Sequence, residues 1–217
     1  NDYIPYPFFM GYASTYAQSK IGSEKVFFRD SIAMAESYDS FYKFLEEISS
    51  KIEFYLIESA TPSWEHDFNL IKNIKNKHPH LKVIVAGPIS TSDQKWDSNI
   101  IHAVIKGEYE KNVMKVINGQ SGIIEHDLLT LDEMNNSPFP YFDKLIYNRY
   151  FDGNPIPMNE LVPQAHIWSS RGCPFKCIFC VWPATMTGND PDGENKRSVR
   201  QYSADYMEGF LDELTSK

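Results

Sequence analysis

The chain has 217 residues, with 21 basic and 29 acidic side chains and a formal net charge of −8. This acidic balance argues against nucleic-acid binding, because proteins that contact phosphate backbones cluster Lys and Arg. We find no apolar run near the roughly 18 residues of a membrane span and no opening signal peptide, so we expect a soluble, cytoplasmic protein. Hydrophobic residues make up 42% of the chain, which is enough to build a packed core.

Short β-rich runs alternate with helical stretches over the first half of the chain. The spacing of apolar residues predicts strands at residues 26–28, 54–57, 82–86 and 103–106. It predicts helices at residues 38–48, from 64 to about 78, and at 109–117. Near-continuous apolar strands that alternate with helices indicate an α/β fold, a doubly wound parallel sheet with helices on both faces.

The loops that follow these strands are the expected ligand-binding region, since ligands bind beyond the carboxyl ends of parallel strands. The loops are Asp30-Ser31, Ser59-Ala60-Thr61, Gly87-Pro88 and Gly107-Glu108. From them we take five candidate cofactor-facing residues, namely Ser59, Thr61, Gly87, Gly107 and Glu108. Each glycine can equally be a plain turn, and Asp30 can be a helix cap or an ordinary loop residue.

The pattern changes after residue 128, where prolines exclude a long helix or a central strand. These prolines are Pro138, Pro140, Pro155, Pro157 and Pro163. We therefore divide the chain into an α/β domain at 1–128, a connector at 129–163 and a last segment at 164–217. The last segment should open with a strand at 164–169 and end with a helix that Ser203 caps, with Asp205 in its first turn. The expected buried face of that helix comprises Tyr206, Met207, Phe210, Leu211 and Leu214.

The three cysteines of the chain lie within eight positions, as Cys173, Cys177 and Cys180, with the spacing C-x3-C-x2-C. An odd and tightly clustered count is not the pattern of a secreted disulfide framework. Three soft thiolates on one short loop can bind three irons of a cubane cluster. The fourth iron would then be open to a small molecule that chelates it through an amine and a carboxylate.

This loop resembles the signature of the radical S-adenosylmethionine enzymes, in which an aromatic residue, here Phe179, precedes the third cysteine. Four other stretches look like the subgroup that carries an N-terminal cobalamin-binding-type domain. They are Arg171-Gly172, Val181-Trp182-Pro183, the stretch 106–110 and Ser137-Pro138-Phe139-Pro140. The resemblance implies a flavodoxin-like, cobalamin-binding-like first domain. It also implies that residues 164–217 begin a partial (β/α)6 barrel.

The resemblance implies that Cys173, Cys177 and Cys180 hold a [4Fe–4S] cluster, with Phe179 against the adenine of S-adenosylmethionine. Reductive cleavage of that cofactor would give a 5′-deoxyadenosyl radical that abstracts a substrate hydrogen. Members of the subgroup act as cobalamin-dependent methyltransferases or catalyse radical rearrangements, and the five candidate loop residues would face the cobalamin. The implied partners are a small-molecule or biosynthetic-intermediate substrate and an electron donor such as flavodoxin or ferredoxin.

The sequence departs from the family in two respects. It lacks the Asp-x-His-x-x-Gly loop that supplies a lower cobalt ligand, so cobalamin binding stays open. A six-unit barrel needs about 180 residues at roughly 30 per unit, far more than residues 167–217 supply. We therefore expect a fragment of a longer enzyme.

The cysteine loop is also compatible with three other functions. The first is a non-catalytic module that binds a corrinoid or a partner and keeps a vestigial loop. The second is a structural zinc site with His166 as fourth ligand, although two-plus-two spacing is commoner for zinc. The third is a redox pair of Cys177 and Cys180.

Overall fold

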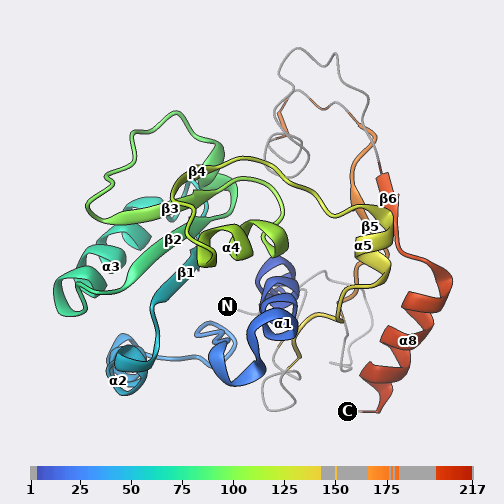
Figure 1. Cartoon of the computed structure of the whole chain (residues 1–217), viewed down its shortest axis with the longest axis horizontal. Helices are drawn as coiled ribbons and strands as arrows, with labels where there is room; N and C mark the ends of the chain where they lie inside the picture. The colour runs from blue at the N-terminus through green and yellow to red at the C-terminus, as the bar shows by residue number, and fades with distance from the viewer. Residues whose placement is uncertain are drawn as a thin grey trace, which may run out of the picture.

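A computed structural model describes residues 4–142, 150, 166–175, 177, 179–180 and 199–216. A four-stranded sheet with its helices forms one part of the molecule, and a small hairpin with the last helix forms another (Figure 1). No helix in these ranges is both long enough and apolar enough to cross a membrane.

The sheet consists of β1 (Phe54–Glu58), β2 (Lys82–Ala86), β3 (Ile101–Ile105) and β4 (Gly122–Ile124). All neighbours are parallel and follow the order β1-β2-β3-β4. The first two confirm their predictions, and β3 begins two residues earlier than expected. The short β4 was not predicted, because three residues give too little alternation to recognise. The described order contains no reversal, so these strands do not show the switch point of a doubly wound sheet.

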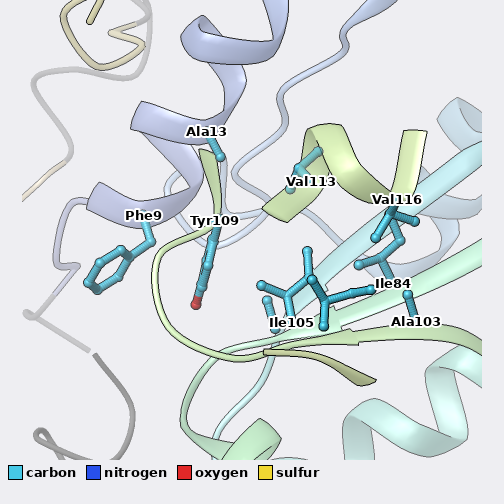
Figure 2. Packing of buried hydrophobic residues seen from close by; sticks show 10 residues of the cluster. Phe9, Ala13, Ile84, Ala103, Ile105, Tyr109, Val113 and Val116 are labelled. Atoms are coloured by element: carbon cyan, nitrogen blue, oxygen red, sulfur yellow. The ribbon is translucent and has the colours of Figure 1, made fainter. Parts of the chain in front are cut away.

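Helices cover both faces of the sheet, as predicted. The helices α1 (Phe8–Ile21) and α4 (Glu110–Ile117) pack on one face, and α3 (Trp64–Lys77) packs on the other. Figure 2 shows the first of these layers, where Phe9 and Tyr109 lie beside the apolar side chains of the sheet. The helix α2 (Tyr38–Ile48) joins a separate cluster through Leu45. Short 3-10 turns lie at Ser23–Lys25, Ser49–Lys51 and Pro88–Thr91.

Two features at the N-terminus differ from prediction. Residues 26–28 form no strand and pair with no described strand, and Phe27 is exposed. The helix α1 was missed, because its apolar residues do not follow a single stripe. Its Phe9 and Ala13 pack on the sheet, whereas its Tyr12 packs toward the C-terminal segment. A helix that lies between two layers is apolar on more than one side and loses the amphipathic pattern.

The C-terminal part contains β5 (Ser170–Gly172) and β6 (Val199–Gln201), which pair antiparallel, followed by α8 (Ala204–Thr215). The expected strand at 164–169 was misplaced, since residues 166–169 form no strand and 164–165 lie outside the described residues. The first βα unit of a barrel remains a prediction, because the partner of β5 among the described strands is β6.

Ser203 caps α8 as predicted, accepting a hydrogen bond from the Tyr206 N–H at 3.1 Å. Tyr206 and Phe210 are buried, but Leu211 is 46% exposed and its predicted burial was wrong. The helix packs through the narrower stripe that faces Phe139, which leaves Leu211 on the solvent side. The helix α5 (Leu131–Asn135) lies within the expected connector and begins with a capping box at Thr130.

Candidate functional site

The cysteine loop leaves β5 at Gly172, whose φ of 98° lies in the region that favours glycine. Cys173 is partly buried, Cys177 and Cys180 are exposed, and all three thiols are free. The N–H of Cys180 donates to the carbonyl of Cys177 at 3.1 Å, which closes a short turn. Phe179, within this turn, is 86% exposed. The loop therefore presents its last two sulfurs and its aromatic side chain outward.

Three cysteine sulfurs are ligands that suit a soft metal centre. In this structure they do not surround a common point. Among the described residues, no three His, Cys, Asp or Glu side chains are placed to hold one metal ion. Thiolate ligands on one loop fit an iron–sulfur cluster, and their accessibility leaves room for one to bind. A bound cluster would require the three sulfurs to lie around one centre, which they do not do here.

His166, the fourth ligand of the zinc alternative, has a different contact. The N–H of Tyr6 donates to its Nδ1 at 3.4 Å, which connects the histidine to the start of the chain. Its Nε2 is buried, and no described group hydrogen-bonds to it. The structure thus does not group His166 with the cysteines as a metal site.

Arg171 anchors the base of the cysteine loop in a buried charge network. Its side chain lies on β5, only two positions before Cys173, and the residue is 4% exposed. Its Nη2 lies 2.7 Å from Glu110 Oε1, and its Nη1 lies 3.4 Å from Glu108 Oε1. Burial by itself lowers the pKa of Arg171, but the charges of Glu110 and other neighbours outweigh it and hold that pKa above its usual value. The guanidinium therefore stays charged inside the protein.

Glu108 is the centre of this network. Its carboxylate accepts hydrogen bonds from both terminal nitrogens of Arg200 on β6, at 3.2 and 2.5 Å. It also accepts one from the Leu129 N–H at 2.9 Å. The sequence suggested Glu108 as a cofactor-facing residue, but its carboxylate is fully engaged by these protein groups. Two carboxylates and two guanidiniums balance one another, which is how buried charges are tolerated.

Aromatic rings complete the surroundings of Arg171. Its guanidinium carbon lies 4.5 Å from the centre of the Tyr12 ring and 5.7 Å from that of Tyr202. Its Nε donates to the Tyr202 hydroxyl at 2.9 Å. Since Tyr12 belongs to α1 and Tyr202 follows β6, one arginine joins the sheet layer to the hairpin.

The structure brings Ser59 and Gly87 together at the carboxyl edge of the sheet. The hydroxyl of Ser59 donates to Asp67 at 2.6 Å, which ties the loop to α3. A Cβ at Gly87, whose φ is 96°, would lie 2.5 Å from the Ser59 carbonyl oxygen. Gly87 therefore allows two strand-end loops to touch. Thr61 is exposed, two residues along from Ser59.

Gly107 precedes Glu108 at the end of β3, and it also has a positive φ, of 81°. A Cβ there would lie 2.7 Å from the ring of His126. This glycine serves close packing within the protein. Whether any of the five loop residues faces a cofactor stays a prediction.

Sequence reasoning missed Glu58, the last residue of β1. The hydroxyl of Tyr109 is the neighbouring group that acts on its carboxyl group. Solvent reaches part of the residue, but desolvation of the carboxyl by the surrounding protein raises its pKa to about 7, and the Tyr109 hydroxyl partly offsets this rise. The available signal was a carboxylate that ends an otherwise apolar strand, Phe-Tyr-Leu-Ile-Glu.

Comparison with known proteins gives a partial similarity. No family model matches the chain, and no solved structure matches it. The chain is 29% identical over 142 residues to the uncharacterized methyltransferase PH0819 of Pyrococcus horikoshii. That similarity covers 56% of this chain and 30% of the relative, so the chain spans about a third of the length of the protein it matches.

Proposed function

We propose that this chain is part of an enzyme that cleaves S-adenosylmethionine reductively at a [4Fe–4S] cluster on the cysteine loop. The observation that carries the proposal is the set of free thiols at Cys173, Cys177 and Cys180, on one loop whose base Arg171 fixes. The methyltransferase name of the similar protein supports a transferase that uses S-adenosylmethionine.

In this proposal each group on the loop has a distinct task. The three cysteines hold the cluster, and the exposed Phe179 is available to lie against the adenine of the cofactor. A bound cluster would supply one electron at an iron that no cysteine ligates. Gly172 lets the chain turn out of β5, and the buried Arg171 holds the start of the loop against the sheet.

Cobalamin is a second candidate cofactor, at the carboxyl edge of the sheet. Parallel α/β sheets bind ligands at this edge, and Ser59, Gly87 and Gly107 lie there. Glu58 and Tyr109 add a carboxyl and a hydroxyl that a ligand with amide groups could meet. A small-molecule substrate and an external electron donor complete the proposed reaction.

Anaerobic reconstitution of the purified chain with iron and sulfide tests the cluster. We expect about four irons per chain and the visible absorption of a [4Fe–4S] centre. Replacement of any one of the three cysteines by Ala should abolish both. A Phe175→Ala variant, which alters the same loop but keeps every thiol, should retain them. Stoichiometric zinc with no iron uptake by the unaltered chain would refute the proposal.

A non-catalytic module that binds a corrinoid or a partner is the second candidate. It is favoured by the placement of the three sulfurs, because no three ligand side chains among the described residues are grouped to hold one metal ion. The two functions separate when S-adenosylmethionine is added to the reconstituted chain and the electron paramagnetic resonance of the reduced cluster is recorded. A changed signal supports the enzyme. Corrinoid binding without any cluster supports the module.

A further inference from the structure

The cysteine loop has little backbone support of its own. The strand β5 is three residues long, and its described partner is β6, of equal length. Hydrogen bonds of this hairpin cannot define where the loop lies relative to the parallel sheet, because β5 and β6 form a separate sheet. The position of Cys173 must therefore depend on side chains that cross from the hairpin to the sheet layer.

Charged side chains connect the hairpin to the sheet layer. Arg171 and Arg200 extend from the hairpin strands, and they meet Glu108 and Glu110, which follow β3. The side chains of both glutamates are 1% exposed, and that of Arg171 is 3% exposed. Buried charges depend strongly on their partners, since an uncompensated one is very costly.

The two glutamates hold Arg171 in different ways. Glu108 lies 3.4 Å from Arg171 Nη1, while its carboxylate accepts its hydrogen bonds from Arg200 and Leu129. Glu110 lies 2.7 Å from Arg171, but neither of its carboxylate oxygens makes an aligned hydrogen bond with any described group. Glu110 therefore stabilises Arg171 through the attraction between their opposite charges.

We propose that Glu110 and Glu108 are positioning residues for the cysteine loop, and that they act through Arg171 to hold Cys173 in its partly buried place. The purpose of this placement, a defined start for a cluster-binding loop, rests on the proposed function. The positioning of Cys173 by these glutamates does not depend on that function, because it concerns a thiol in the metal-free chain.

The test is the rate at which a thiol reagent alkylates each cysteine in the metal-free chain, resolved by mass spectrometry of peptides. In the unaltered chain, Cys173 should react more slowly than the exposed Cys177 and Cys180. Glu110→Gln should speed alkylation of Cys173 by at least about tenfold and leave the other two rates nearly unchanged, since it releases the base of the loop.

A matched control is Glu36→Gln, which removes another buried carboxylate paired with an arginine. Glu36 pairs with Arg29 and has a side chain that is 2% exposed. Its loss should not change the Cys173 rate. If it accelerates Cys173 as much as Glu110→Gln does, the effect is general destabilisation and the proposal fails. An unchanged Cys173 rate in folded Glu110→Gln protein overturns it as well.

Arg171→Lys covers the case in which Glu110→Gln does not fold. Lysine keeps the charge but loses the donor to Tyr202 and the second nitrogen that reaches Glu108. Its Cys173 rate should lie above that of the unaltered chain, and a wild-type rate would overturn the role of the guanidinium. Absence of iron uptake in the unaltered chain would refute the proposed function and leave these thiol results standing.

Discussion

The parallel sheet and the β5–β6 hairpin are stabilised by different forces. The sheet lies between two layers of apolar side chains, and Val83, Val85 and Ile105 are fully buried in it. The hairpin has six strand residues, and its arginines, the buried Arg171 and the partly buried Arg200, meet two glutamates beyond β3. Apolar burial is non-directional and tolerates small shifts, whereas a buried ion pair requires its partners in place. The cysteine loop thus depends on a few specific contacts.

The largest expected effect comes from Glu108→Gln, which removes a buried negative charge that lies beside the guanidiniums of both Arg171 and Arg200. We expect it to lower the free energy of unfolding by about 3–5 kcal/mol, as measured by urea denaturation. Glu53→Gln, which breaks the exposed pair with Lys82, should cost at most about 1 kcal/mol. Equal losses in the two variants would contradict the claim that burial makes the network strong.

A core truncation probes the sheet side of the comparison. Ile71 on α3 is fully buried against the sheet, so Ile71→Ala should cost about 2–4 kcal/mol in the same denaturation experiment. Leu211→Ala, at an exposed position of α8, should change stability by no more than about 0.5 kcal/mol. If the two substitutions cost the same, the layered core described for the sheet is wrong.

The helix cap after the hairpin gives a smaller effect. Ser203→Ala removes the hydroxyl that accepts from Tyr206 N–H and should cost about 1 kcal/mol. Ser216→Ala is the matched control, because that hydroxyl donates to the Glu213 carbonyl at the end of the helix and caps no helix start. A neutral Ser203→Ala variant would show that contacts of Tyr206 and Phe210, not the cap, determine where α8 begins.

The last prediction concerns pH at the carboxyl edge of the sheet. The pKa of Glu58 is about 7 in the folded protein, against an ordinary value of 4.5. Between these two values the folded chain binds the proton more tightly than the unfolded chain, so stability should fall as pH rises from about 4.5 to about 7. Glu58→Gln should remove this fall, as followed by urea denaturation over a pH series.

Tyr109→Phe sharpens the same test. The Tyr109 hydroxyl lowers the pKa of Glu58, so its removal should extend the fall in stability to higher pH. A pH profile of Glu58→Gln that runs parallel to that of the unaltered chain would show that the carboxyl is not desolvated as described.

Local patterns predicted those parts of the fold that depend on neighbouring residues. The strands at 54–57 and 82–86, the helix α2 and the Ser203 cap all follow from spacing within a few positions. The errors concern elements whose surroundings decide their form. Residues 26–28 have strand-forming side chains but no strand partner, and α1 has no single apolar stripe because it is covered on two sides.

The candidate site divides in the same way. By itself the sequence determined the spacing of the three thiols and the presence of charged residues beside them, because both are properties of a short stretch of chain. Only the tertiary structure decided that Glu108 meets Arg200, which is 92 positions away, and that Glu58 meets Tyr109. Burial and the pairing of charges depend on which distant segments pack together, and a local pattern of residues does not predict that packing.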